Sequence, residues 1–366
     1  MIIKSIELVN YRNYEKAHID LDSGINILYG DNAQGKTNIL ESVYMCATTK
    51  SHRGSKDKEI IKFGTSESHI RCFFEKNETE YQIDMHLRED KSKGIAVNGI
   101  KLKRAADLLC LVNIILFSPE DLSIIKNGPS DRRRFVDSEL CQLDKIYLYN
   151  LTNYNKIVNQ RNNVLKDIYI HPELADTLDV WDSQLVNLGS KIIERRKIFI
   201  DQLNEIINGI HSNLSGNKEI LKIQYDPNIS IEEYEKKIGK NREKDIKYKV
   251  SSVGPHRDDF IFYINDFDVK KYGSQGQQRT AALSLKLAEI ELVKRITGNT
   301  PILLLDDVLS ELDSNRQNYL INSINNIQTI ITCTGLDEFV NSRIVINKIF
   351  KVHDGTVTTN RENEGV

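Results

Sequence analysis

The stretch Gly30-Asp31-Asn32-Ala33-Gln34-Gly35-Lys36-Thr37 decides the fold, because it fits the pattern G-x-x-x-x-G-K-T at every fixed position. A short apolar run, Ile25 to Tyr29, precedes this phosphate loop, and a helical pattern follows from Lys36 to about Thr48. A strand, a glycine loop and a helix in this order form the setting in which the pattern binds nucleotide. A chance glycine turn is the alternative, which the neighbouring strand and helix disfavour.

The residue types of the loop suit a phosphate ligand. Backbone N–H groups and the N-terminus of the following helix would face the phosphates, and the glycines let the backbone come close. Lys36 is expected to reach the β- and γ-phosphates, and the Thr37 hydroxyl to ligate Mg²⁺. We therefore predict that ATP is contacted by Gly30, Asp31, Asn32, Ala33, Gln34, Gly35, Lys36, Thr37 and Asn38.

An acidic pair ends a second apolar strand, which runs from Ile302 to Asp306. Such a strand delivers carboxylates to the edge of a sheet, where an ATPase needs them for Mg²⁺. We predict that Asp306 holds the metal and that Asp307 orients or deprotonates the attacking water, which makes Lys36 and Asp307 the catalytic residues. A core strand that ends in two solvated aspartates would be the better interpretation without the phosphate loop.

A third motif, Gly273-Ser274-Gln275-Gly276-Gln277-Gln278, opens a helix shortly before the acidic strand. Ser-x-Gly-Gln at a helix N-terminus is typical of the ABC ATPase superfamily, whose members dock it on the γ-phosphate held by a second subunit. This resemblance implies a homodimer in which Ser274, Gly276 and Gln277 act on the partner's nucleotide. A simple helix cap is the alternative for the motif alone. A candidate D-loop, Ser310 to Asp313, follows the acidic strand.

The remaining sequence divides into strand-rich ends and a helical middle. Further strands are expected over residues 2–9, 17–21, 68–75, 81–87, 95–97, 114–117, 220–225, 260–264 and 328–332, and Asn98-Gly99 predicts a type I′ turn. From Asp131 to Ile210 apolar residues recur at threes, fours and sevens, which predicts two antiparallel helices of about 50 Å each. A projecting hairpin and a compact bundle fit this spacing equally well. Gly355 to Val366 is expected to be a polar tail.

Composition bounds the class of protein. The net charge of -2 means that any nucleic-acid contact must come from a local basic patch. The five cysteines are scattered, which is typical of buried residues in a reducing compartment. The longest apolar run, Leu108 to Phe117, is far shorter than the roughly 20 residues that span a bilayer. We therefore expect a cytosolic protein without a membrane partner.

Six stretches stand in a fixed order over nearly the whole chain: Leu8 to Tyr14, Ser51 to Arg53, Phe117 to Leu122, Arg132 to Asp137, Gly254 to Asp259 and Gly273 to Thr280. Together they resemble the RecF family of bacterial DNA replication and repair proteins. The resemblance implies an α/β fold: an ABC-type ATPase head, with mixed β-sheets and flanking helices, and an inserted all-α helical-hairpin domain. The expected division is a split head, 1–125 and 250–366, and an insertion, 126–249.

The family resemblance also implies partners and a function. It predicts a chain that binds ATP, dimerises on single- and double-stranded DNA near gaps, and works with RecO and RecR to load RecA. The resemblance also places Arg12 near nucleotide or DNA, so we assign it to the ATP site, and Arg53 is expected to reach the γ-phosphate or DNA. A surface role is the open alternative for each arginine.

DNA contact is predicted from basic residues, because phosphates need only Lys and Arg and carry no sequence information. The candidates are Arg53, Arg132, Arg133 and Arg134, with the basic segment from Lys50 to Lys58. We expect binding that is indifferent to sequence and weakened by salt. The three consecutive arginines could instead pin the inserted domain to the head.

Two features predict slow hydrolysis. Transporter-type ABC ATPases usually carry Glu where this chain has Asp307, whose carboxylate is one methylene shorter, and Ile331 to Thr334 lacks their switch histidine. A transporter subunit is an alternative function, but its signature lies about a hundred residues after the phosphate loop and here the gap exceeds two hundred. Another SMC-like ATPase is the second alternative, although the helices are too short for a long coiled-coil arm.

Overall fold

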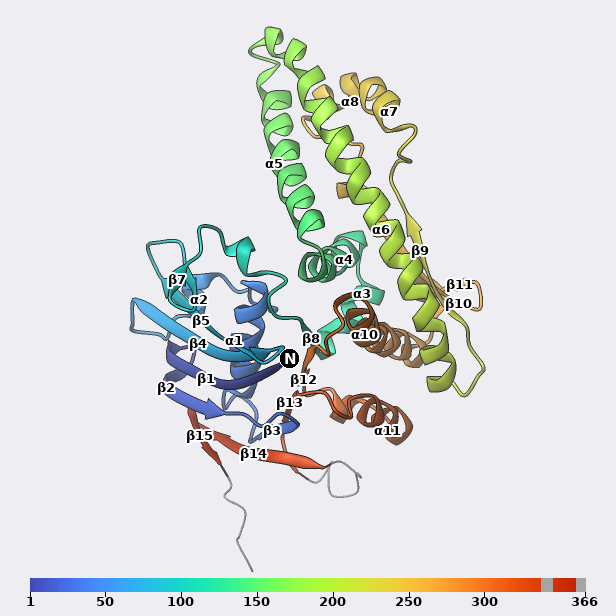
Figure 1. Cartoon of the computed structure of the whole chain (residues 1–366). Coiled ribbons are helices and arrows are strands. Elements are labelled where there is room, and N and C mark those ends of the chain that lie inside the picture. Colours follow the sequence, from blue (N-terminus) through green and yellow to red (C-terminus); the bar gives the residue numbers. More distant parts are fainter. Residues whose placement is uncertain (337–344, 360–366) are drawn as a thin grey trace, which may run out of the picture. The chain divides into compact units, whose positions relative to one another are not determined.

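The computed structural model describes residues 1–336 and 345–359, and the chain divides into two compact units (Figure 1). The first unit comprises Met1–Asp121 and Glu289–Val366, and the second comprises Leu122–Ala288. No helix in the described ranges is both long and apolar enough to cross a membrane.

The first unit contains two six-stranded sheets. One is antiparallel, in the order β2-β1-β4-β5-β6-β7, and consists of β1 Ile2–Tyr11, β2 Tyr14–Asp20, β4 Glu67–Lys76, β5 Thr79–Arg88, β6 Gly94–Val97 and β7 Ile100–Lys101. The other, in the order β15-β14-β3-β13-β12-β8, consists of β3 Ile25–Tyr29, β8 Ile114–Phe117, β12 Ile302–Asp306, β13 Thr329–Cys333, β14 Ile346–His353 and β15 Thr356–Thr359. Most of the predicted strands are confirmed within two or three residues.

Helix α1, Lys36–Thr48, packs against strands of both sheets (Figure 1). Its Ile39, Leu40 and Val43 are fully buried in the core that the two sheets share. Strands β3, β13, β12 and β8 are mutually parallel, so their carboxyl ends meet at one edge of the sheet. This edge carries both the phosphate loop after β3 and the acidic pair at the end of β12. The shorter helices of the unit are α2 Asp57–Ile60, α11 Ser314–Ser323 and the 3₁₀ turns Ala105–Leu108, Pro119–Asp121 and Leu309–Glu311.

The second unit is built on a helical hairpin with a three-stranded sheet. Its helices are α3 Leu122–Lys126, α4 Pro129–Leu143, α5 Lys145–Asp167, α6 Leu178–Leu214, α7 Tyr234–Lys240, α8 Arg242–Tyr248 and α9 Val269–Tyr272, with 3₁₀ turns at Pro172–Thr177 and Pro255–Arg257. Strands β9 Leu221–Asp226, β10 Asp259–Ile264 and β11 Phe267–Asp268 form the sheet in the order β11-β10-β9. Helix α10, Gln275–Thr297, begins in this unit and ends in the first.

Three predictions of local structure were wrong. The first long helix is interrupted at Asp144, whose side chain accepts hydrogen bonds from the backbone N–H groups of Ile146 and Tyr147 and so starts α5. The 23 residues of α5 span only about 35 Å, whereas the 37 residues of α6 span about 55 Å. The expected polar tail is also partly structured, because Thr356–Thr359 forms β15. Helices α7 and α8 had no counterpart in the sequence-based predictions. Residues 360–366 lie outside the described residues.

The compact units do not coincide with the predicted head and insertion. Strand β10 pairs along its whole length with β9, and this pairing keeps residues 250–288 with the helical unit. The two compact units are sets of residues that contact one another. The predicted boundaries at 125 and 249 instead follow the architecture that the family resemblance implies. The division into a split head and an insertion therefore stays a prediction.

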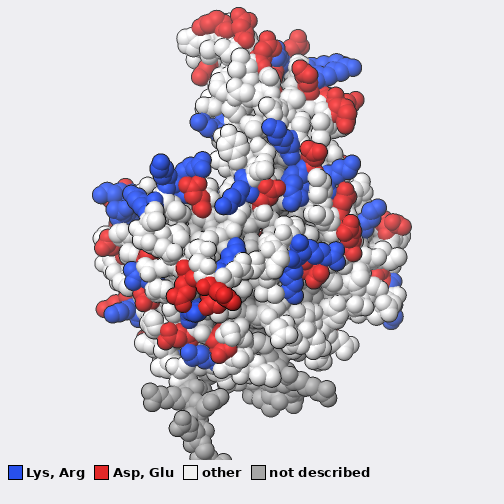
Figure 2. All heavy atoms as spheres, viewed as in Figure 1, with Lys and Arg blue, Asp and Glu red and all other residues white. Residues whose placement is uncertain are grey.

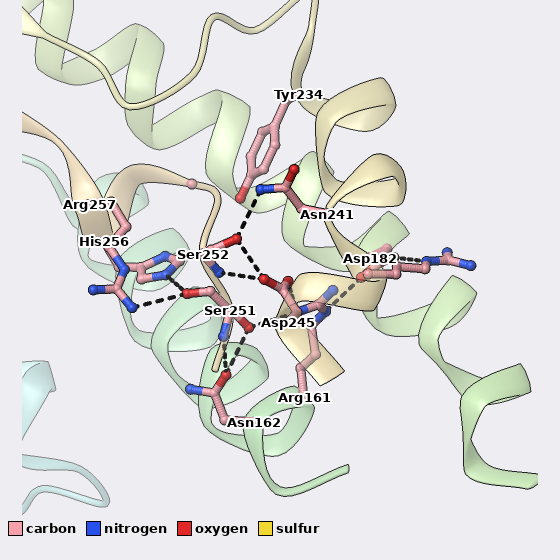
Figure 3. A network of polar contacts seen from close by, with 12 residues as sticks. Arg161, Asn162, Asp182, Tyr234, Asn241, Asp245, Ser251, Ser252, His256 and Arg257 are labelled. Atoms are coloured by element: carbon pink, nitrogen blue, oxygen red, sulfur yellow. Dashed lines mark hydrogen bonds and ion pairs between the residues drawn. The ribbon is translucent and has the colours of Figure 1, made fainter. Parts of the chain in front are cut away.

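Figure 3 shows a network of polar contacts within the second unit that includes Ser251 and His256, the residues on either side of the turn at Gly254. His256 Nδ1 lies 2.7 Å from the Tyr154 hydroxyl, and its Nε2 lies 3.0 Å from the Ser251 carbonyl oxygen. Since a carbonyl only accepts, Nε2 carries the proton and the neutral ring accepts from Tyr154. Gly254 has φ +132°, and a Cβ there would lie 2.2 Å from the Tyr154 oxygen, so this turn requires glycine.

We expect this histidine to make the stability of the protein pH-dependent. Burial lowers the pKa of His256 to about 4 in the folded protein. In the unfolded chain the pKa is about 6.5, so between these two pH values only the unfolded chain binds the proton. The contribution to stability is present above about pH 6.5 and is lost as the pH falls toward 4, by about 2 kcal/mol between pH 7 and pH 5. Urea unfolding at these two pH values should show the loss. His256→Gln should remove it and the exposed control His171→Gln should not; equal slopes in all three proteins would contradict the assignment.

Candidate nucleotide-binding site

The phosphate loop connects β3 to α1, and two of its glycines are sterically required. Gly30 has φ +152°, and a Cβ there would lie 2.2 Å from the Val352 carbonyl oxygen of β14. Gly35 has φ +113°, and a Cβ there would lie 2.6 Å from Asn13 Nδ2 and 2.7 Å from the Tyr14 hydroxyl. The loop is therefore held between two neighbouring segments in a conformation that only glycine accommodates at these positions.

Lys36 folds back into the loop. Its Nζ donates to the backbone carbonyls of Gly30 at 2.5 Å and Asp31 at 2.7 Å. Burial lowers the pKa of this ammonium, and the carboxylates of Asp307 and Asp306 oppose the shift. A buried positive charge inside a turn of backbone amides is an arrangement suited to a polyphosphate.

Asp306 and Thr37 lie in direct contact at the edge of the parallel sheet. The Thr37 hydroxyl donates to Asp306 Oδ1 at 2.8 Å, although the two residues are 269 positions apart in the sequence. Oxygen ligands of this kind suit Mg²⁺, which binds through one or two carboxylates and keeps its remaining positions for water and phosphate oxygens. The donor set on the chain therefore fits the predicted metal.

Thr332 is a residue of this site that the sequence analysis missed. Its hydroxyl lies 2.8 Å from Asp306 Oδ1 and accepts a hydrogen bond from the Asp307 backbone N–H at 3.0 Å. In the register of β12 and β13, Thr332 is the direct neighbour of Asp306. Two buried threonines, Thr329 and Thr332, in a short strand were the available signal, but the partner of Thr332 is visible only once the strand pairing is known.

Asp307 stands at the start of the turn after β12, with a left-handed φ of +53°. Its carboxylate lies 3.5 Å from the Ser310 hydroxyl, which instead donates at 2.9 Å to the Asp307 carbonyl oxygen. Among the described residues, the Asp307 carboxylate thus has only this long contact beside the buried Asp306, and its role in orienting water stays a prediction. In the candidate D-loop, Asp313 caps α11 by accepting from the Arg316 backbone N–H.

Arg12 is bound within the first unit. Its Nε and Nη2 donate to the two carboxylate oxygens of the buried Glu41 on α1, at 2.8 and 2.7 Å. Nη2 also donates to the Ser55 hydroxyl and Nη1 to the Glu59 carbonyl. This arginine ties α1 to residues 51–60, and its contact with ATP stays a prediction.

Arg53 lies close to the phosphate loop. Its Nη1 donates to Asn38 Oδ1 at 3.2 Å, and Asn38 donates in turn to Asn13. Asn13 Nδ2 completes the chain by donating to the Gln34 carbonyl of the loop. The exposed guanidinium is therefore placed beside the phosphate loop, and its contact with the γ-phosphate or with DNA stays a prediction.

The second unit carries the signature residues at the exposed start of α10. Ser274 and Gly276 are exposed, and a Cβ on Gly276 would come no closer than 3.9 Å to the Ser274 hydroxyl. The chain itself therefore does not require glycine at this position. A ligand that approaches the end of the helix would require glycine there, because a side chain would stand in its way.

The three consecutive arginines of α4 have different environments. Arg132 is buried and donates through Nε and Nη2 to both carboxylate oxygens of Asp259, at 2.7 and 2.9 Å. Arg133 donates to the Asp258 carbonyl, and the exposed Arg134 pairs with Asp131. A buried guanidinium engaged by a carboxylate is not available to a DNA phosphate, which favours a structural role for Arg132.

Figure 2 shows charges of both signs interspersed over one face of the protein. Acidic side chains gather at the end of the α5–α6 hairpin, where the exposed residues include Asp167, Glu173, Asp176 and Asp179. Like charges repel, so we do not expect this end of the hairpin to contact DNA phosphates.

Comparison with known proteins gives consistent results. Residues 2–358 match the family described as RecF/RecN/SMC N terminal domain. The DNA replication and repair protein RecF of Lachnospira eligens is 63% identical over 359 residues, which cover 98% of this chain and 99% of that protein. The RecF protein of Lachnoclostridium phytofermentans is 60% identical over 357 residues, with the same coverage.

Solved structures similar to this chain are described with the same protein name as these related sequences. A structure described as the recombination mediator protein RecF with ATPrS in the RecFOR pathway has a TM-score of 0.91 and 36% identity, and covers 98% of each chain. A second, with ATP, has a TM-score of 0.90. The Smc head domain of Pyrococcus furiosus has a TM-score of 0.57 at 16% identity, which shows a shared fold alone. The predicted ABC-type ATPase fold is confirmed.

Proposed function

This chain belongs to the RecF family of DNA replication and repair proteins, and from that premise we propose that it is an ATP-dependent DNA-binding protein whose nucleotide closes a homodimer on DNA. The observation that carries the proposal is the assembly of Lys36, Thr37, Asp306 and Thr332 at one sheet edge. ATP-bound relatives with the same fold support it.

ATP is proposed to bind along the phosphate loop, where Asn38 is the last residue that contacts it. Lys36 would exchange its loop carbonyls for the β- and γ-phosphate oxygens, and its positive charge would stabilise the charge on the transferring phosphoryl group. Thr37 and Asp306 would hold Mg²⁺, which supplies further positive charge between the phosphates. Thr332 keeps the Asp306 carboxylate in place through its hydroxyl.

The second half of the site is proposed to come from another copy of the chain. An exposed helix N-terminus with a serine hydroxyl and a glycine offers backbone N–H groups and a favourable dipole to an external anion. Ser274, Gly276 and Gln277 would meet the γ-phosphate of the partner's ATP. The nucleotide then joins the two chains, and its loss separates them.

Hydrolysis is proposed to be slow and stimulated by DNA. Asp307 would orient the attacking water, and its side chain reaches less far than the glutamate of transporter-type ATPases. A slow reaction suits a protein that must remain on DNA while other proteins assemble. RecO and RecR are the partners proposed from the family, with the loading of RecA as the outcome.

We expect ATP to strengthen the binding of gapped and double-stranded DNA, and salt to weaken it. Fluorescence anisotropy with labelled DNA of two unrelated sequences should give equal affinities that fall as salt rises. Arg53→Ala, compared with Arg104→Ala as an exposed control of the same unit, should lower the affinity in ATP. A wild-type protein that binds neither DNA in ATP would contradict the proposal and favour another SMC-like or ABC-type ATPase.

A further inference from the structure

A chain of hydrogen bonds runs from the signature segment into the core of the second unit. Gln277 Nε2 donates to Glu219 Oε1 at 2.8 Å, and Glu219 Oε2 lies 3.1 Å from His211 Nε2. His211 is fully buried near the end of α6, and its Nδ1 lies 2.9 Å from the Ser284 hydroxyl on α10. None of the six family stretches contains Glu219 or His211.

The proton positions in this chain follow from the chemistry of the groups. A carboxylate only accepts hydrogen bonds, so Gln277 must present its NH₂ group to Glu219, and His211 must carry a proton on Nε2. The orientation of the Gln277 amide is thereby fixed, with its oxygen turned toward the start of the helix.

The amide oxygen of Gln277 has a specific partner there. It accepts from the Ser274 backbone N–H at 2.8 Å, while the Ser274 hydroxyl oxygen accepts from the Gln277 backbone N–H at 3.2 Å. These two bonds form a capping box, which holds the first turn of α10. Because the Ser274 hydroxyl accepts in this pair, its own proton remains for donation to a phosphate oxygen.

The His211 end of this hydrogen-bond network is anchored in the same helix, α10. The Ser284 hydroxyl donates to the Thr280 carbonyl at 2.7 Å, and the Thr280 hydroxyl donates to the Gly276 carbonyl at 2.7 Å. Glu219 and His211 thus contact α10 at two points, one in its first turn and one two turns later. Glu219 comes from the segment between α6 and β9, so the contact links separate elements.

From this geometry we propose that Glu219, held by His211, is a positioning residue that keeps the signature segment in the conformation that receives the γ-phosphate of a second copy. The inference rests on the proposed function, because it assigns Glu219 to the signature half of the shared site. Glu219 itself does not touch the nucleotide. It acts through Gln277 and Ser274.

Replacement of Glu219 should weaken ATP-dependent dimerisation without weakening the binding of ATP to a single chain. In Glu219→Ala the Gln277 amide loses its charged partner, and we expect dimerisation to weaken by about tenfold or more. Glu219→Gln keeps the size of the side chain and one oxygen for Gln277, and its N–H can donate to His211 once that ring carries its proton on Nδ1, so we expect a smaller loss than in Glu219→Ala. The exposed Glu235→Ala, in the same unit, is the matched control and should behave as wild type.

Mixed dimers test whether Glu219 acts on the partner's nucleotide. Lys36→Arg has a defective loop and an intact signature segment, whereas Glu219→Ala has the reverse. Each variant alone should hydrolyse ATP more slowly than wild type. An equimolar mixture should regain up to about a quarter of wild-type turnover, because random pairing makes half of the dimers mixed and each mixed dimer has one intact site of two. Recovery also shows that the Glu219→Ala chain is folded.

The outcomes separate the inference from the function on which it rests. If wild type fails to dimerise in ATP, both are overturned. If wild type dimerises but Glu219→Ala and Glu219→Gln dimerise equally well, the positioning role alone is overturned. A defect that the mixture does not relieve would likewise overturn it, because it would place the effect of Glu219 within its own chain.

Discussion

Replacing Lys36 with alanine should reduce ATP turnover by at least about a hundredfold and abolish ATP-dependent dimerisation. The ammonium is the positive charge that the loop supplies to the β- and γ-phosphates, and a lost group of this kind costs about 3–4 kcal/mol of transition-state stabilisation. Phosphate release and sedimentation, each with and without ATP, measure the two effects.

Two controls make this experiment specific. Lys36 also donates to the carbonyls of Gly30 and Asp31, so the thermal unfolding of the variant must be compared with wild type. Lys16→Ala removes an exposed lysine from β2 in the same unit and should leave turnover unchanged. Substantial turnover by a folded Lys36→Ala protein would show that the phosphate loop is not the hydrolytic site.

Replacing Arg196 with methionine should destabilise the protein by about 3–5 kcal/mol, because it leaves the buried Asp258 and the partly buried Asp137 without their charged partner. The guanidinium is 2% exposed and donates to Asp137 at 2.7 Å, Asp258 at 2.8 Å and the Pro255 carbonyl at 2.7 Å. Burial raises the pKa of the Asp258 carboxyl even beside this arginine. The free energy of unfolding in urea gives the loss directly.

The adjacent residue provides the comparison for this variant. Lys197→Met makes a similar change on the exposed side of the same helix and should cost less than about 0.5 kcal/mol. Adding Asp258→Asn to Arg196→Met should recover part of the stability, since a neutral amide is cheaper to bury than an unpaired carboxylate. Equal stability of Arg196→Met and Lys197→Met would show that the buried pairs contribute little.

The local parts of the fold were predictable because their signals are contiguous. The bounds of β3, α1 and β12 agree with the sequence to the residue, since buried parallel strands are short, mostly apolar runs and the glycine loop marks where the first strand ends. Strand β14 lacks such a run, because lysines such as Lys348 alternate with its apolar residues near the edge of the sheet. The short helices α7 and α8 have too few turns to show a periodicity.

The pairings within the sites were not predictable. Thr332 faces Asp306 only through the register of β12 and β13, and Glu219 meets Gln277 across 58 residues. Such contacts depend on tertiary packing, which a single sequence does not display. The sequence indicated the types of residue that bind a nucleotide, and the structure adds the residues that hold them in position.

Sedimentation of the wild-type protein with and without ATP tests the central claim most directly. The claim is that ATP bound in the loop of one chain is completed by the signature segment of another. We predict a monomer without nucleotide and a dimer in ATP, and a Ser274→Arg variant that binds ATP but stays monomeric because the larger side chain blocks the approach of the phosphate. A wild-type protein that remains monomeric when saturated with ATP, or a Ser274→Arg variant that dimerises equally well, would contradict the account.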